Sequence, residues 1–577
     1  MLLDKNLIIK KGELMKVRNS VILFVLVSIV ISIFTGCSQT SQEATSVASP
    51  ELKNSGDTAR TEDAGILKVA VFSDAKTLMP FVGNGSTETF ISGLVYDTLI
   101  SYDEEKKEYS PLLAKEWSTS ADGRTLSFVL NEKAKWPDGS PVTADDVVFS
   151  YDFVFKNKFP GQMAILQNFD HITKTGENSV DIVVKSPSGN ALRFMATAIV
   201  ILPSKVWADI SNPKAYVNYT EDSGPVGSGP VYITKKVDGR YILLNTKKDY
   251  YNGPLNIDQI KLSVVRDTTV GVAELQKGTY DVLDLSVDPA LASEIEKNPE
   301  EYKNIKVNVT DSTEIAALMF NVRKYPWNDI NLRRAIALTV NQKELIDNLL
   351  EGYGSPASPG MVSQINDYFN KSLSPREQDL QAARQLLSDS GYIDIDNDGF
   401  VETPKGEKLT LELLCGNTSV PMSTADYLVL GIKSIGINAV SKPITHEAMV
   451  NKKKEGNSDV FVTSLNFGTA YDMLYYYFNS ARGEMKDGSV VGFNYGGFCD
   501  PRYDELSDNL LKEKDVSVQK QYLQEMQQII ADSYYYVPLY SPKSLTLYRD
   551  DRFTGWTSIP GQSILNGSTL KNLKPKP

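Results

Sequence analysis

The sequence predicts an α/β protein with more than one domain. Short apolar segments that alternate like half-buried strands are interleaved with amphipathic segments of helical period, which favours α/β lobes over a β-sandwich or a helical bundle. A length of 577 residues allows two or more cores. After residue 37 only Cys415 and Cys499 remain, so packed cores rather than a disulfide framework must hold the fold, with either one bridge or two free thiols.

The first forty residues have the composition of a secretory signal. Lys11, Lys16 and Arg18 precede a stretch from 21 to 34 that is apolar except for serines and is shorter than the about twenty residues that cross a bilayer. The following Thr35-Gly36-Cys37 resembles the bacterial lipobox, in which the cysteine is lipidated and becomes the first mature residue. We therefore predict a lipoprotein signal peptide over 1–36 and lipidation of Cys37. An ordinary signal peptide with an incidental cysteine is the alternative.

Residues 37–65 are predicted to form a flexible tether. They are rich in Ser, Thr, Ala, Glu and Asp and contain few large apolar residues, so they cannot bury enough surface to order themselves. A flexible coil of this length has a mean reach on the order of 30 Å. Such a tether would hold a globular body close to a membrane surface.

Strand and turn signals mark the first half of the globular part. Residues 67–72 form the first predicted strand, and Asp122-Gly123 is a turn before a second, Thr125–Leu130. Thr143 and Asp146 form a capping box, which starts a helix. Further strands are predicted at 180–184, 241–245, 260–265 and 316–322.

Helix signals follow in the second half. Asn341 with Glu344 caps a helix that Gly352 ends. Ser374-Pro375 opens a second helix, with proline at the first helical position, and this helix ends near Gly391. A third runs from about 518 to 531 and is followed by the apolar segment 537–540.

Composition and motifs exclude several classes of function. A net charge of −12 argues against a basic surface for nucleic acid, so we predict no DNA or RNA partner. His171 and His446 are the only histidines and lie far apart, which argues against a metal hydrolase or a Ser-His-Asp triad. The chain has no nucleophile elbow or Walker loop, and the Gly-rich segment 224–230 fits a turn. We therefore predict no enzymatic activity, no cofactor and no catalytic or metal-binding residues.

An acidic segment, Asp394 to Gly399, looks like the start of a calcium loop. Oxygen-bearing side chains stand at alternate positions and glycine is sixth. The twelfth position is Lys405, where a bidentate glutamate would be needed. A solvated turn is the prediction, and a weaker site that uses Glu402 is the alternative.

Four blocks of sequence together match a known pattern. They are VYDTL at 95–99 with PLLAKEW at 111–117 and KWPDGSPVTADDV at 135–147; GSGPVY at 227–232; MFNV at 319–322 with NLRRAI at 331–336; and VPLY at 537–540. In this order they resemble the extracellular solute-binding proteins of the peptide and nickel class of ABC importers, called family 5. The resemblance extends over about 66 to 560.

This resemblance implies a two-lobed clamshell of the periplasmic binding-protein type. Carried onto this chain, lobe one would span 66–315 and 535–577, with 96–200 as an extra subdomain, and lobe two would span 316–534. The chain would cross between the lobes near Phe320-Asn321 and near Tyr536-Val537, and these crossings would form the hinge. Hinge closure around a ligand is the expected motion.

The resemblance also implies ligand contacts on lobe one. Gly83, Asn84, Gly85 and Ser86 correspond to the segment that contacts ligand backbone in the family, where glycines permit close approach. A plain turn after the first strand is the alternative. Tyr540 would lie at the rim of the cleft, or else be buried beside the hinge.

On lobe two, the implied cleft wall departs from the family pattern. Family members have a Trp near Phe467 and an Asp that pairs with the amino terminus of a peptide, whereas the corresponding position here is Ala470. Asp472 is the acidic candidate and is equally a candidate N-cap of the next helix. Tyr475 to Tyr477 in that helix are expected to pack rather than to bind. The remaining predicted contacts of this wall are Asn466, Thr469 and Tyr471.

The function implied by the resemblance is ligand capture without chemistry. The protein would be a monomeric, lipid-anchored receptor outside the cell membrane, periplasmic if the cell has an outer membrane, that passes oligopeptides to an ABC permease and its ATPase. A nickel chelate or an oligosaccharide on the same scaffold, and a receptor that senses a peptide signal, are alternatives. A secreted hydrolase is the rival class and would need a nucleophile or metal cluster that the sequence does not supply.

Overall fold

The computed structural model describes residues 65–577 apart from positions 84, 104, 105, 107, 188–190, 285, 286, 469, 470, 472 and 514. The predicted signal peptide, the lipidation site Cys37 and the tether up to residue 64 lie outside the described residues, as do Asn84, Thr469 and Asp472. No helix in the described part of the chain is long and apolar enough to cross a membrane.

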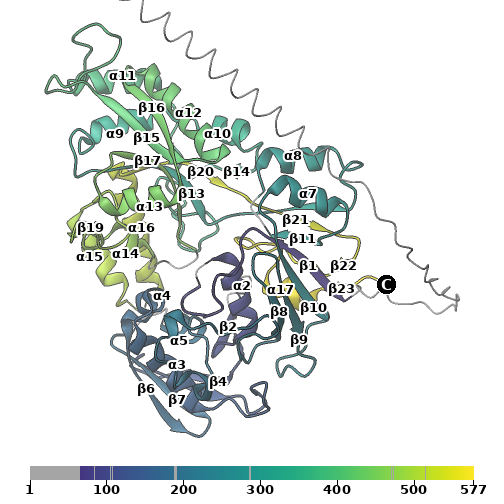
Figure 1. Cartoon of the computed structure of the whole chain (residues 1–577). Helices are drawn as coiled ribbons and strands as arrows, with labels where there is room; N and C mark the ends of the chain where they lie inside the picture. The colour runs from purple at the N-terminus through teal and green to yellow at the C-terminus, as the bar shows by residue number, and fades with distance from the viewer. Residues whose placement is uncertain are drawn as a thin grey trace, which may run out of the picture. The chain divides into compact units, whose positions relative to one another are not determined.

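A seven-stranded sheet is the first of two large sheets (Figure 1), with the strand order β12-β21-β11-β1-β10-β9-β8. Its central strand β1 (Ile66–Val71) runs parallel to both neighbours, so that Val69 lies opposite Leu262 of β10 and Val282 of β11. Alternate residues of β1 enter the cores on the two faces of the sheet. The other strands are β8 (Val231–Val237), β9 (Tyr241–Thr246), β10 (Gln259–Val264), β11 (Val282–Asp284), β12 (Ile305–Thr310) and β21 (Ser544–Arg549).

A six-stranded sheet is the second, with the order β14-β20-β13-β17-β15-β16. Apolar cores cover both faces of this sheet. Neighbouring residues of strand β13 (Glu314–Phe320) point to opposite faces, so Leu318 enters one core and Ala317 the other. Its neighbours β17 and β20 run antiparallel to it, and β15 runs parallel to β16 and β17. These strands are β14 (Gly354–Ser355), β15 (Thr410–Gly416), β16 (Asn438–Ile444), β17 (Val460–Asn466) and β20 (Tyr536–Pro542).

Helices surround both large sheets. Around the seven-stranded sheet these are α2 (Ser86–Val95), α7 (Thr268–Gln276), α8 (Pro289–Lys297) and α17 (Gly567–Asn572). Around the six-stranded sheet they are α9 (Ile330–Ala337), α10 (Gln342–Leu349), α11 (Leu380–Asp389), α12 (Ser419–Ser434), α13 (His446–Glu455), α14 (Met473–Phe478), α15 (Pro501–Leu510) and α16 (Val516–Ser533). This alternation of strands and helices confirms the predicted α/β class.

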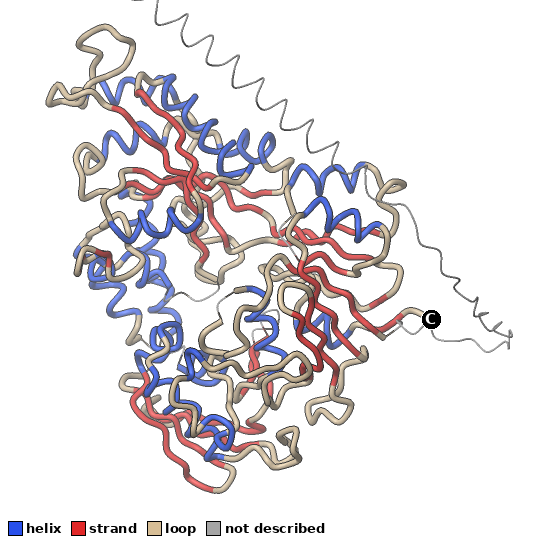
Figure 2. Tube along the Cα trace, in the orientation of Figure 1, coloured by secondary structure: helices blue, strands red, loops and turns tan. Residues whose placement is uncertain are grey.

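A smaller four-stranded sheet lies in the segment between β1 and β8 (Figure 2). Its order is β4-β5-β7-β6, formed by β4 (Ala114–Thr119), β5 (Thr125–Leu130), β6 (Phe169–Gly176) and β7 (Ser179–Val184). Helix α3 (Ala144–Asn157) packs on this sheet and starts at the predicted capping box of Thr143 and Asp146. The apolar residues of this unit share one continuous core with the seven-stranded sheet.

The positions where the chain passes between the two large sheets differ from the prediction. Strand β12 belongs to the seven-stranded sheet and β13 to the six-stranded sheet, so the first crossing is 311–313. Strands β20 and β21 place the return at Lys543. The predicted crossings at Phe320-Asn321 and Tyr536-Val537 are wrong, because β13 and β20 pair with each other and carry these residues inside the six-stranded sheet. Residues 536–542, predicted in lobe one, therefore belong to the sheet of lobe two.

One predicted helix start is also wrong. Helix α11 begins at Leu380, with Asp379 as N-cap, and not at Ser374-Pro375. The preceding segment makes tertiary contacts instead: Arg376 donates to the carbonyl of Ala531, and Gln378 donates to the carbonyl of Thr339 at 2.8 Å. These contacts hold residues 374–379 against neighbouring elements, so the helix starts five residues later.

The two cysteines of the globular part are free thiols. Cys415 is buried in β15 and Cys499 is exposed before α15. The sequence leaves open either one disulfide bridge or two free thiols, and the structure has two free thiols. Packed apolar cores therefore hold this part of the fold.

Candidate functional site

A cavity of about 1230 Å³ lies between the two large sheets. Lobe two contributes Ser464 and Asn466 at the end of β17 and residues 418–421 after β15, and lobe one contributes residues of α7, α8 and β21. The crossing residues Ser312, Thr313 and Lys543 also line it. Ligands of open α/β sheets bind outside the carboxyl ends of the strands, which is where β15 and β17 place this cavity.

Hydrogen bonds fix the crossing side of the cavity. Thr313 Oγ1 donates to Asn466 Oδ1 at 2.7 Å, and Ser541 Oγ donates to the carbonyl of Glu314 at 2.7 Å. The Tyr540 hydroxyl lies 2.9 Å from Thr424 Oγ1, and burial raises the pKa of this tyrosine. Because these bonds join β13, β17, β20 and the crossings, they hold the surface that a ligand would meet.

The charges on the cavity wall are predominantly negative. Four carboxylates line it, namely Asp288, Glu294, Glu301 and Glu314. Lys543 is the single lysine or arginine among the described residues that line the cavity, and its ammonium group pairs with Asp311. The positive charge of Lys543 is therefore already engaged.

Polar contacts join α8 of lobe one to lobe two beside the cavity. Ser419 Oγ donates to Asp288 Oδ2 at 2.8 Å, and Ser293 Oγ donates to Glu351 Oε2 at 3.3 Å. The Tyr353 hydroxyl donates to Glu296 in the same region. The ion pair between Lys297 Nζ and Glu351 Oε2 at 3.5 Å adds to them, so these contacts between the lobes are polar.

The structure places two of the predicted ligand contacts on this cavity. Asn466 and Tyr540 line it, and Tyr540 is also only 4% exposed, so it combines the two predicted roles of cleft residue and buried residue. Gly83, Gly85 and Ser86 lie at the start of α2 and do not line it. A ligand contact for these three residues stays a prediction.

The other predicted residues of the lobe-two wall are in or beside a core. Phe467 is 2% exposed, and its ring packs edge-on against Tyr477 with centroids 4.8 Å apart. The ring of Tyr471 packs edge-on against Tyr368 at 6.2 Å. Tyr477 in turn stacks on Phe493, in agreement with the predicted packing role of this helix. In this structure Phe467 is a packing residue, because its ring fills the core under α14.

Sequence reasoning missed Asp288, Glu314 and the segment 418–421. None of them belongs to a recognised motif. The available signal was topological, because each lies at or beside one end of a strand: Glu314 begins β13, 418–421 follows β15, and Asp288 follows β11. These strands belong to two different sheets, so the positions meet only when the two sheets are brought together in the tertiary structure.

Carboxylates of the acidic segment 394–399 form ion pairs with a lysine that follows it in the sequence. Lys408 Nζ lies 2.7 Å from an oxygen of Asp396 and 2.7 Å from an oxygen of Asp398, which raises the pKa of Lys408 and lowers that of Asp398. Asp394 Oδ2 accepts from the backbone of Gly399 at 2.9 Å. The segment is thus an exposed turn whose carboxylates have protein partners, as expected for a solvated turn.

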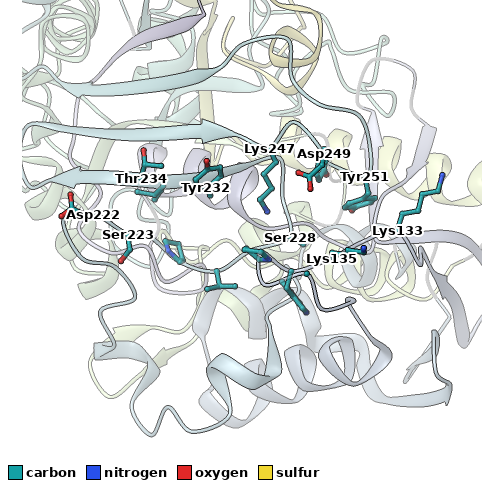
Figure 3. Close-up of a pocket in the computed structure, with 18 residues that line it drawn as sticks. Lys133, Lys135, Asp222, Ser223, Ser228, Tyr232, Thr234, Lys247, Asp249 and Tyr251 are labelled. Atoms are coloured by element: carbon teal, nitrogen blue, oxygen red, sulfur yellow. The ribbon is translucent and has the colours of Figure 1, made fainter.

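A second cavity, of about 570 Å³, lies within lobe one (Figure 3). Strand β8, the segment 247–251 after β9 and the loop 222–228 form its walls, and Lys247 donates to the carbonyl of Gly227 at 2.8 Å. Behind it the buried Asp97 accepts from Tyr250 at 2.8 Å and Tyr251 at 2.9 Å, and burial raises the pKa of this aspartate. The wall also carries Lys133 and Lys135. No residue of the six-stranded sheet lines this cavity.

Comparison with known proteins identifies similar sequences and folds. Residues 108–486 match the model of bacterial extracellular solute-binding proteins, family 5. The chain is 24% identical over 563 residues to the oligopeptide-binding protein AppA of Bacillus subtilis, covering 96% of this chain and 98% of that one. It is 25% identical to the heme-binding protein A of Haemophilus influenzae, covering 74% and 77%.

Solved structures show the same fold. The oligopeptide-binding protein of Thermotoga maritima superposes with a TM-score of 0.79 at 21% identity, covering 89% of this chain and 100% of that one. AppA of Bacillus subtilis in complex with a nonapeptide superposes with a TM-score of 0.73 at 21% identity, covering 89% and 99%. NikZ of Campylobacter jejuni in complex with Ni(L-His) gives 0.73 at 20% identity, also covering 89% and 99%. At these identities the likeness establishes a common fold.

Proposed function

Because the chain belongs to the family 5 bacterial extracellular solute-binding proteins, we propose that it is the receptor of an ABC importer and binds oligopeptides between its two lobes. The observation that carries this proposal is the cavity of about 1230 Å³ whose walls come from both large sheets. A ligand held there would touch both lobes at once and would favour the closed arrangement over an open one. Relatives named for oligopeptide binding support a peptide as the ligand.

The protein would bind and release this ligand unchanged. The residues on the cavity wall supply hydroxyl, amide and carboxylate groups, which suit reversible hydrogen bonding to a peptide backbone. Transport energy would come from the ATPase of the partner permease. The permease would receive the ligand when the lobes open.

Calorimetry and small-angle X-ray scattering test this proposal together. The purified protein is titrated with peptides of two to nine residues, with a nickel–histidine complex and with mannohexaose. We expect heat of binding and a smaller radius of gyration with peptides, because closure brings the lobes together. Heat with the nickel complex or the sugar alone, or scattering that no peptide changes, would refute peptide capture.

A variant that fills the cavity tests its location. Ser464 is exposed on the cavity wall, so Ser464→Trp should weaken peptide binding about tenfold or more by occupying ligand space. Ser388→Trp is the matched control, because Ser388 is exposed on α11 of the same lobe and does not line the cavity. Equal loss of affinity in both variants would contradict the assignment.

We also propose that Cys37 carries a lipid that keeps the receptor at the outer face of the cell membrane. The lipobox-like sequence before it supports this proposal. Cys37→Ser should move the protein from the membrane fraction to the medium or periplasm, because serine has no thiol to which the lipid could be attached and the acyl chains that enter the membrane would be lost. Fractionation of cells that express each form measures the change, and an unchanged membrane fraction would count against lipidation.

A further inference from the structure

The interlobe cavity has an excess of negative charge that the cavity within lobe one does not share. Its wall carries four carboxylates, while Lys543 is already paired with Asp311. The cavity within lobe one has the opposite balance, with three lysines against Asp222 and Asp249 (Figure 3). The net charge of −12 therefore does not explain the acidic wall, which is a local property of the cleft.

The four carboxylates differ in their partners. Asp288 accepts from Ser419 Oγ and from the backbone of Ala290, and Glu294 accepts from the Tyr302 hydroxyl at 2.8 Å. Glu301 is exposed. The carboxylate of Glu314 is half-buried and has neither a hydrogen bond nor an ion pair with the side chains or backbone of the described residues.

Glu314 stands at the junction of the two lobes. It is the first residue of β13, directly after the crossing 311–313, and it lies opposite Asn466 in the strand pairing. Its charge is close enough to Tyr540 to raise the pKa of that residue, after the larger effect of burial. A ligand that reaches the crossing side of the cavity would therefore meet this carboxylate.

Closure makes an unpaired carboxylate costly. When the lobes close on a ligand, water is removed from the cavity, and an ionised group without a partner loses hydration that nothing replaces. A ligand ammonium or guanidinium group would form a charge-assisted hydrogen bond with it and offset this cost. An anionic ligand group would add repulsion. A cationic group on the ligand would therefore favour the closed state more than a neutral or anionic group.

We propose that this receptor selects solutes that carry a cationic amino or guanidinium group, and that Glu314 is the residue that binds this group. The inference rests on the proposed function and adds the ligand class. For a peptide the cation would be a lysine or arginine side chain. The carboxylates of Asp288, Glu294 and Glu301 would attract such a ligand to the cleft.

Calorimetry with probes of opposite charge tests the inference on the whole purified protein. The probes are trilysine, triglutamate and spermidine, each at low and at 0.5 M salt. We expect trilysine to bind at least about tenfold more tightly than triglutamate, with an affinity that falls as salt rises. Glu314→Gln should weaken trilysine about 10- to 100-fold, because the neutral amide keeps the shape and loses the charge-assisted bond. Glu314→Lys should reverse the preference between the two peptides.

Asp222→Asn is the matched control. It removes the same charge from an exposed loop that lines the cavity within lobe one, and should leave trilysine affinity within about twofold. Equal affinities for trilysine and triglutamate, or equal affinities of wild type and Glu314→Gln for trilysine, would overturn the inference and leave peptide capture standing. Spermidine binding without peptide binding would support the amine preference and overturn oligopeptide capture. No binding of any probe or library peptide would overturn both.

Discussion

Replacement of Arg333 by alanine is expected to lower the free energy of unfolding by about 3–5 kcal/mol, because it removes a buried guanidinium group from three backbone carbonyls. Arg333 is on α9 and is 6% exposed. It donates to the carbonyl of Trp327 at 2.7 Å, of Ser533 at 2.8 Å and of Tyr534 at 3.1 Å. Two of these carbonyls end α16, where backbone groups have no partner within the helix.

This arginine also supports the candidate site from a distance. Two of the carbonyls that it binds, of Ser533 and Tyr534, come just before β20, and β20 leads to the crossing at Lys543. Loss of the contact should therefore weaken ligand binding as well as stability, although Arg333 does not line the cavity.

Urea unfolding of three variants measures the effect of Arg333. Arg334→Ala is the control, because Arg334 is the next residue on the same helix and is exposed, and it should change stability by less than about 0.5 kcal/mol. Arg333→Lys should lie between the two, since an ammonium group cannot reach three carbonyls in a plane. It also gives a measurable value if the alanine variant does not fold. Equal stability of the Arg333→Ala and Arg334→Ala proteins would show that the three bonds contribute nothing.

Replacement of Gly227 by alanine should cost about 3 kcal/mol or more, because a backbone atom occupies the space of the new methyl group. A Cβ at this position would lie 2.0 Å from the carbonyl oxygen of Val95. The loop of Gly227 packs against the end of α2, where Ser228 Oγ accepts from the backbone of Asp97 at 3.2 Å. Displacement of the loop would break this bond and the contact of Lys247 with Gly227.

Gly93→Ala is the control for Gly227→Ala. Gly93 is inside α2, and a Cβ there would meet nothing within 4 Å. Alanine is the better helix former, so this variant should gain about 0.5–1 kcal/mol. Thermal and urea unfolding of both variants measure the difference. A Gly227→Ala protein as stable as wild type would mean that the loop can move away from α2 at no cost.

The position of the ligand cleft could be predicted from the sequence, whereas its negative charge could not. Family membership predicts a ligand between lobes, and Asn466 and Tyr540 were identified as cleft residues from the resemblance. Glu314 has no such signal, because a glutamate at the start of a strand is usually solvated and unremarked. Two structural observations single out Glu314 as a candidate ligand contact. It has no cationic partner among the described residues, and it lies beside the crossing between the lobes.

Local signals in the sequence predicted several elements closely. The capping box of Thr143 and Asp146 starts α3, and Asn341 caps α10 through the backbone of Glu344. Strand β5 has the predicted bounds, 125–130. In each case residues within about four positions of one another determine the structure, so the sequence pattern is sufficient.

The errors have long-range causes. The predicted crossings failed because pairing of β13 with β20 depends on residues more than 200 positions apart, such as Leu318 and Val537. The predicted start of α11 failed because Arg376 bonds to the distant Ala531. Neither partner can be inferred from the residues around it.

The sequence by itself determined the α/β class, the positions of several strands and helices with clear local signals and the dependence on packed cores, since periodicity, caps and turn residues act over a few neighbours. Only the tertiary structure decided which strands share a sheet, where the chain passes between lobes and that the half-buried carboxylate of Glu314 on the cavity wall has no partner among the described residues. These properties depend on contacts between distant segments, whose hydrogen bonds and burial arise only after the strands have been brought together.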